Sequence, residues 1–134
     1  MIGAIIITHG GLAASLLEAA ELISGKVENI KTVSVKSSDA TDSVRSFLTS
    51  AVKEVNRGKG VVIFTDMFGG TPTNIALSVL ELGKVEVITG VNLPIILKFI
   101  NHRGEKTLKE LVPLLKEYGQ KSIVLAGDML KESK

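Results

Sequence analysis

Along this chain, short runs of apolar, often β-branched residues alternate with stretches in which apolar residues recur every three or four positions. The first pattern is typical of strands in a parallel sheet, and the second is typical of amphipathic helices. The segments with a strand pattern are residues 2–8, 29–36, 61–65, 85–89 and 122–126. Helical patterns lie between them, so the sequence predicts a three-layer α/β fold around a mostly parallel sheet.

The polarity of the strand segments predicts their order in the sheet. Residues 2–8 and 61–65 are the least polar, which indicates central strands covered on both faces. The other two segments of the first four contain charged residues, so we expect them outside the central pair. The order 2-1-3-4 satisfies this pattern and puts the switch point, where such folds bind ligands, between the first and third strands. Residues 122–126 are expected to form a C-terminal edge strand.

Local signals predict where several helices begin and end. Thr71 fits an N-cap with Pro72 in the first helical position, and this helix is expected to run to Gly83. Pro94 marks a second proline-started helix. Pro113 lies inside the apolar pattern of the last helix, which predicts a kink or a break there.

Length and composition restrict the class of protein. With 134 residues the chain is expected to be one domain, residues 1–134, with a short polar tail from about residue 129. The formal net charge of +2 favours neither nucleic acid nor a membrane surface, and no signal peptide or membrane helix is predicted. The absence of cysteine excludes disulfides, thiol catalysis and cysteine-ligated zinc. We therefore expect a cytoplasmic location.

Two residues at the predicted switch point have side chains suited to catalysis. His9 follows the first strand and Asp66 follows the third, so the topology brings an imidazole and a carboxylate together. A carboxylate that accepts from one ring nitrogen leaves the other as a nucleophile or base. The alternative is a structural pair, in which Asp66 caps a turn. A metal site is not expected, because the other histidine, His102, belongs to a predicted helix end.

Glycine-containing loops follow three of the predicted strands. Their glycines are Gly10, Gly11, Gly69, Gly70 and Gly90. Such loops let a ligand approach the backbone, and the helices after two of them favour an anion, although ordinary turns also use glycine. Thr71 either donates to that anion or only caps its helix. A nucleotide cofactor is not expected, because neither a Walker sequence nor G-x-G-x-x-G is present.

Three sequence motifs resemble a known family. They are IIITHG ending at Gly10, FTDMFGGTPTN starting at Phe64, and GVNLP starting at Gly90. In this order and spacing they are similar to the mannose-family IIA domain of the bacterial phosphoenolpyruvate-dependent sugar phosphotransferase system. The resemblance extends from Met1 to about Asp128.

The resemblance implies a function and roles for several residues. His9 would accept a phosphoryl group from the phosphocarrier protein HPr and pass it to a histidine of a IIB domain, without a cofactor. Asp66 would orient His9. The phosphoryl group would be bound by Gly10, Gly69, Gly70, Thr71 and, in the third loop, Asn92.

The resemblance also implies partners for the chain. It implies a homodimer in which the last strand crosses to the partner's sheet. Many members continue into a IIB domain, whereas this chain ends at Lys134. We therefore expect IIB to be a separate polypeptide, through which the protein associates with membrane components without membrane insertion.

Three alternative functions remain open from the residues alone. A phosphotransfer subunit of dihydroxyacetone kinase shares the fold and the histidine, although the DMFGGTP and GVNLP loops favour the sugar branch. A regulatory module that binds targets according to its phosphorylation state would use the same His9 chemistry. A metal-dependent hydrolase would combine His9 with Asp66. The sequence does not predict which sugar is transported.

Overall fold

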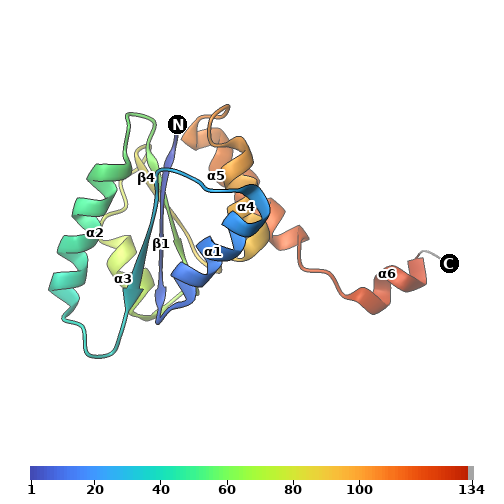
Figure 1. Cartoon of the computed structure of the whole chain (residues 1–134), viewed down its shortest axis with the longest axis horizontal. Coiled ribbons are helices and arrows are strands. Elements are labelled where there is room, and N and C mark those ends of the chain that lie inside the picture. The colour runs from blue at the N-terminus through green and yellow to red at the C-terminus, as the bar shows by residue number, and fades with distance from the viewer. Residues whose placement is uncertain (133–134) are drawn as a thin grey trace.

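The computed structural model describes residues 1–132, and its centre is a four-stranded parallel sheet between two layers of helices (Figure 1). The strands are β1 (Gly3–His9), β2 (Ile30–Val35), β3 (Val61–Thr65) and β4 (Val85–Ile88). Their order is β2-β1-β3-β4, and every neighbouring pair is parallel. The predicted fold class, layers and order of the first four strands are confirmed.

The two helical layers cover opposite faces of the sheet (Figure 1). One layer contains α1 (Leu12–Ser24), α4 (Leu93–His102) and α5 (Leu108–Lys121), and the other contains α2 (Thr41–Val55) and α3 (Gly70–Leu77). Successive side chains of a strand point to opposite faces, so Ile6 of β1 packs in the first layer and Ile5 and Ile7 in the second. All of β1 is buried except its last residue, His9. The buried residues therefore hold β1 in the core, and only the side chain of His9 lies at the surface.

Two predictions about helices are wrong in detail. Helix α3 begins at Gly70 after the N-cap Gly69, so Thr71 is not its N-cap, and it ends at Leu77, before Gly83. Its start is set by the positive φ angles of Gly69 and Gly70, +94° and +82°, which turn the chain sharply into the helix. At its end, the Ser78 hydroxyl donates to the Ile75 carbonyl and competes with a further helical turn.

Pro113 lies within α5 without breaking it, so of the predicted kink or break the break does not occur. A proline inside a helix removes one N–H donor, and the carbonyl four residues earlier loses its partner. Here both Pro113 and Lys109, the residue four positions earlier, are exposed. Water can therefore replace the missing hydrogen bond, and the helix continues to Lys121.

The predicted C-terminal edge strand is not formed. After α5, residues 123–125 belong to no strand and lead into α6 (Ala126–Glu132), which projects from the rest of the molecule (Figure 1). This helix also replaces the polar tail expected from about residue 129. A strand needs a neighbouring edge for its backbone hydrogen bonds, and the chain leaves the sheet before it meets one. Ile123, Val124 and Leu125 are consequently 80%, 55% and 70% exposed.

Helix length and polarity restrict how the chain relates to a membrane. Among residues 1–132, no helix combines the length and the apolar character needed to span a bilayer.

Candidate functional site

His9 and Asp66 meet at the carboxyl end of the sheet, as predicted. Strands β1 and β3 are parallel neighbours in which Ile7 is paired with Thr65, so the residues that follow lie side by side. One carboxylate oxygen of Asp66, Oδ2, accepts from His9 Nδ1 at 2.8 Å and from the His9 backbone N–H at 3.0 Å. Because an ionised carboxylate only accepts, Nδ1 carries a proton, and Nε2 of the neutral ring has the free lone pair.

The charge on Asp66 is stabilised mainly by His9. Burial raises the pKa of the Asp66 carboxyl, since its side chain is 13% exposed. The hydrogen bonds from the His9 ring and backbone N–H, with the attraction that the ring adds when it is protonated, outweigh burial and lower this pKa below 3.8. The other carboxylate oxygen, Oδ1, is buried and has no hydrogen-bond partner among the described residues. Asp66 is therefore an ionised acceptor that holds the His9 ring in one orientation, with Nδ1 toward the carboxylate.

Gly70 keeps the Nε2 edge of the His9 ring accessible. A Cβ atom at this position would lie 3.0 Å from His9 Cε1 and 3.3 Å from Nε2, and φ is +82°. A side chain at residue 70 would therefore crowd the nitrogen that Asp66 leaves free. The His9 side chain itself is 51% exposed.

Two helix N-termini lie near His9. That of α1 follows it closely in the chain, and that of α3 lies beside its ring in space. Helix α1 starts after Gly11 and α3 starts after Gly69, and neither N-cap glycine has a side chain that could cap its helix, although in α1 the Ala13 N–H donates to the Thr8 hydroxyl at 2.8 Å. Uncapped N–H groups and the positive end of the helix dipole favour an anion. Pro72 contributes no N–H, so the first turn of α3 offers the N–H groups of Gly70 and Thr71 as donors.

Strand β2 holds the turn that follows His9. The Gly10 N–H donates to the Val35 carbonyl at 3.0 Å, and the Ser34 hydroxyl donates to the Gly10 carbonyl at 2.6 Å. The sequence reasoning did not select Ser34. Its signal is a polar residue near the carboxyl end of a strand, in register with Thr8.

Two buried threonines, also missed from the sequence, hold the loop that carries Asp66. The hydroxyl oxygens of Thr65 and Thr73 are 2.8 Å apart, and the Thr73 hydroxyl donates to the Met67 carbonyl. Thr73 has one hydroxyl proton, so Thr65 is the donor to Thr73. This chain of hydrogen bonds ties the end of β3 and the Asp66 loop to α3. Its only sequence signal is a threonine ending an otherwise apolar strand.

Replacing Thr73 with valine is expected to lower the free energy of unfolding by about 1–3 kcal/mol, because the buried Thr65 hydroxyl and the Met67 carbonyl both lose their partner. Chemical denaturation monitored by circular dichroism measures this loss. Thr73→Ser keeps the hydroxyl and should recover most of the stability. The matched control is Thr49→Val, since the Thr49 hydroxyl also donates to a backbone carbonyl, that of Arg45, but on α2. Equal stability of the two valine variants would contradict the assigned role.

Thr71 and Asn92 have different surroundings. Thr71 is exposed in the first turn of α3, directly after the glycine that contacts the ring. Asn92 is the N-cap of α4, where its Oδ1 accepts from the Ile95 N–H at 3.0 Å. Its Nδ2 lies 3.3 Å from both the Gly119 carbonyl and the Ser122 hydroxyl. The hydrogen bonds of the Asn92 side chain therefore join α4 to the end of α5 and do not include His9.

The remaining candidates for metal or acid–base chemistry lie elsewhere. His102 ends α4, as predicted, and its Nδ1 is 2.5 Å from Glu105 Oε1. Within residues 1–132, no three His, Cys, Asp or Glu side chains are grouped so that they could hold a metal ion.

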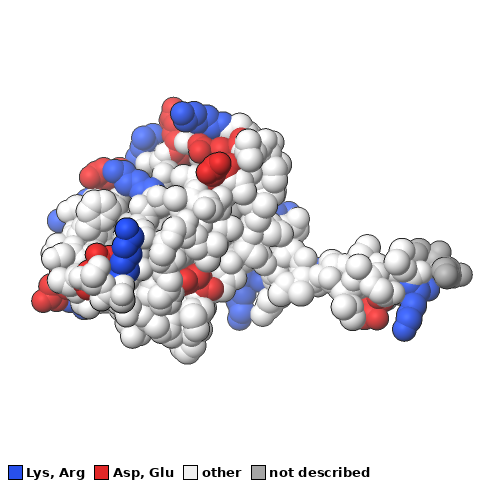
Figure 2. Space-filling model, turned by 60° about the horizontal axis from the view of Figure 1, so that its bottom comes forward, with Lys and Arg blue, Asp and Glu red and all other residues white. Residues whose placement is uncertain are grey.

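The surface around His9 is apolar and accessible. Leu12 begins α1, and Met67 and Phe68 lie in the Asp66 loop, with exposed fractions of 46%, 53% and 80%. Figure 2, in which the carboxyl ends of the strands are turned toward the viewer, shows a face where large areas carry no charged residue. Exposed apolar side chains beside an exposed imidazole suit brief contact with another protein.

Sequence comparison gives consistent relatives. The family profile EIIA-man, described as "PTS system fructose IIA component", matches residues 3–115. The chain is 31% identical over 135 residues to the PTS system fructose-specific EIIA component of Bacillus subtilis (strain 168), covering 100% of this chain and 92% of that protein. It is 30% identical over 124 residues to the PTS system mannose-specific EIIAB component of Escherichia coli (strain K12), covering 91% of this chain but 38% of that protein.

Solved structures show the same fold over nearly the whole chain. Phosphotransferase system component EIIA from Streptococcus agalactiae superposes with a TM-score of 0.85 at 28% identity, covering 96% of this chain and 99% of that one. The PTS IIA protein associated with the fucose utilization operon from Streptococcus pneumoniae has a TM-score of 0.85 at 26% identity, covering 96% and 95% of the two chains. With this sheet order and these relatives, the chain belongs to the fructose- and mannose-type IIA components of the bacterial sugar phosphotransferase system (PTS).

Proposed function

We propose that His9 is the phosphoacceptor of this IIA component. It takes a phosphoryl group from phosphorylated HPr and gives it to a histidine of a IIB component during sugar uptake, in the cytoplasm. The observation that carries the proposal is the asymmetric environment of the ring. Nδ1 is held by Asp66 at 2.8 Å, whereas Nε2 faces a glycine and the solvent.

The transfer step needs positioning more than added chemistry. The lone pair of Nε2 attacks phosphorus in line, and the new N–P bond forms as the N–P bond of the donor phosphohistidine breaks. The electron pair of the broken bond returns to the donor imidazole. The phosphorylated ring, still protonated at Nδ1, gains positive charge that the Asp66 carboxylate offsets. The N–H groups at the start of α3 would stabilise the phosphoryl oxygens.

Phosphorylation in a reconstituted system tests the assignment. The protein is incubated with phosphoenolpyruvate, enzyme I and HPr, and the product is analysed by mass spectrometry. We expect one phosphate per chain, labile to acid and stable to alkali, on the peptide that contains His9. Phosphate on any other residue would overturn the proposal. Transfer onward to a IIB component, compared with transfer to a dihydroxyacetone kinase subunit, separates the two phosphotransfer functions.

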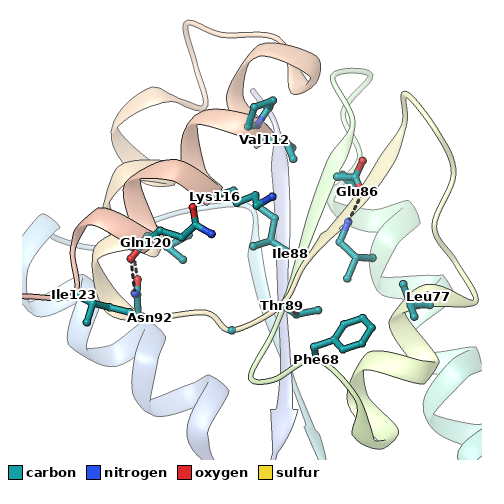
Figure 3. A pocket seen from close by; sticks show the side chains of 15 residues that line it. Phe68, Leu77, Glu86, Ile88, Thr89, Asn92, Val112, Lys116, Gln120 and Ile123 are labelled. Carbon is teal, nitrogen blue, oxygen red and sulfur yellow. Dashed lines mark hydrogen bonds between the residues drawn. The ribbon is translucent and has the colours of Figure 1, made fainter.

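We also propose that two copies of the chain form a dimer by exchanging residues 123–125. Strand β4 is an edge strand of the four-stranded sheet. A cavity of about 720 Å³ lies between β4 and α5 (Figure 3). Labelled side chains from both sides surround it: Ile88 and Thr89 at the strand, Val112, Lys116 and Gln120 on α5, and Phe68 and Ile123. An extended apolar segment of a partner would pair with the open edge and cover this cavity.

Proline at residue 124 is expected to convert the dimer to a monomer, since proline removes a backbone donor from the exchanged strand. Sedimentation or light scattering gives the mass, which for the wild type should be twice the 14.2 kDa of one chain. Gly127→Pro is the matched control, because it places proline in the first turn of α6, where helices tolerate it. A wild-type monomer at micromolar concentration, or a Val124→Pro dimer, would contradict this exchange.

A further inference from the structure

At the end of the sheet opposite His9, a cavity of about 690 Å³ is surrounded by cationic side chains. Its walls are residues that precede β3 and β4, together with the connection between α4 and α5. The cationic lining residues are Lys59, Lys84, Arg103, Lys106 and Lys109. Glu105 is the one acidic residue of the lining, and its carboxylate is held by His102. The cavity therefore has a marked excess of positive charge.

Arg103 gives this cavity a buried cation. Its side chain packs over the Phe99 ring, with the guanidinium carbon 5.6 Å from the ring centroid, and the residue is 7% exposed. Its Nη1 is buried and has no hydrogen-bond partner among the described residues. Burial lowers the pKa of Arg103, and the charge of Glu28 opposes this effect. Arginine nonetheless remains protonated, and a buried cation without a full set of partners is energetically unfavourable.

The rim of the cavity supplies further donors. Among residues 1–132, no ion pair includes Lys59, Lys106 or Lys109, although Lys106 attracts the Glu110 carboxylate, and Lys84 is 3.4 Å from Glu81. Asn56 accepts from the N–H groups of Gly58 and Gly60 through Oδ1, which leaves its amide nitrogen as a donor. The acidic Glu110 nearby is engaged by Thr107 in the capping box of α5. Donors thus greatly outnumber free acceptors around the opening.

We propose that this cavity binds a small organic or inorganic anion that carries two or more phosphate groups. The volume lies in the range of about 300–1,000 Å³ that is usual for small-molecule sites. Lysine and arginine side chains from separate segments would each contact a phosphate oxygen, and these are the residues that bind phosphate best. A concave site with an almost buried arginine is reached by a small ligand more readily than by a flat macromolecular surface. The site lies at the amino ends of the strands, so it does not depend on the role of His9.

Amide chemical shifts in ¹H–¹⁵N NMR spectra test this proposal. The probes are pyrophosphate and glucose 1,6-bisphosphate, each titrated into the full chain. We expect saturable shifts at Gly60, Lys84 and Gly104. The double variant Lys84→Gln/Lys106→Gln should weaken binding at least about tenfold, because two charge-assisted contacts are lost. Both substituted lysines are at the rim, so the fold is expected to be retained.

Two control variants identify the site that is responsible. Lys53→Gln/Lys131→Gln removes the same charge from exposed positions outside the cavity and should leave the affinity unchanged. The helix N-termini near His9 are a second place where phosphate could bind, so His9→Ala is the second control. It should leave the affinity unchanged, because His9 lies at the other end of the sheet. Absence of saturable binding at millimolar concentration would overturn the proposal. Equal weakening by the control pair, or loss of binding in His9→Ala, would overturn it as well.

Discussion

Replacing His9 with alanine is expected to abolish phosphorylation of the chain by phosphorylated HPr. The variant has no imidazole beside Asp66, and neither water nor a hydroxyl group can form the same reactive N–P bond. The His9 side chain is 51% exposed, so the fold should persist. We expect a loss of about 1 kcal/mol in unfolding free energy, from the ring hydrogen bond to Asp66. Transfer of labelled phosphate and thermal unfolding measure the two effects.

His102→Ala is the matched control for this experiment. Its imidazole is also held by a carboxylate, that of Glu105, but it lies at the end of α4, near the amino ends of the strands and away from His9. The control should be phosphorylated at the wild-type rate. Retention of label in His9→Ala, or its loss in His102→Ala, would contradict the assignment of the phosphoacceptor.

Replacing Asp66 with asparagine is expected to slow phosphoryl transfer to His9 by about 100-fold or more. The amide is nearly isosteric but neutral, so it neither fixes a proton on Nδ1 nor offsets the charge of the phosphorylated ring. Single-turnover transfer from phosphorylated HPr measures the rate. Asp42→Asn, which removes an exposed carboxylate from the start of α2, should leave it unchanged. A wild-type rate in Asp66→Asn would show that the carboxylate has no part in the transfer.

The same substitution has a pH signature in stability. The pKa of Asp66 in the folded protein lies below its ordinary value of 3.8. Its ionised form therefore stabilises the fold fully above that ordinary value, and this stabilisation is lost as the pH falls through the lower, folded pKa. The difference in unfolding free energy between wild type and Asp66→Asn should be constant near neutral pH and shrink in acid. A difference that grew in acid would contradict the lowered pKa.

The sequence could predict the His9–Asp66 pair because simple rules apply at each step. The apolar runs identify β1 and β3 as central strands, and parallel pairing puts their carboxyl ends together. A histidine after one strand and an aspartate after its neighbour must then be close. The sequence also places Gly70 near the ring, because Gly70 follows β3, as Asp66 does.

Other features depend on packing that no local pattern contains. The hydrogen bonds of Asn92 are set by where α5 ends, and the threonine chain is set by where α3 packs on β3. Residues 123–125 have the composition of a strand, but in their own chain they pair with no strand and lead into α6. In the proposed dimer the edge for such a strand would come from a second molecule, which the pattern along one chain cannot determine.

The proposed phosphoacceptor His9 and its partner Asp66 are 57 positions apart in the sequence, and no local structure brings them together. An unfolded or half-folded chain keeps the imidazole but loses the carboxylate that aims it. The ability to take up phosphate should therefore track the native population of the protein. Misfolded copies would not accept phosphate and would not compete for phosphorylated HPr. The rate of phosphoryl transfer would then be proportional to the number of natively folded molecules.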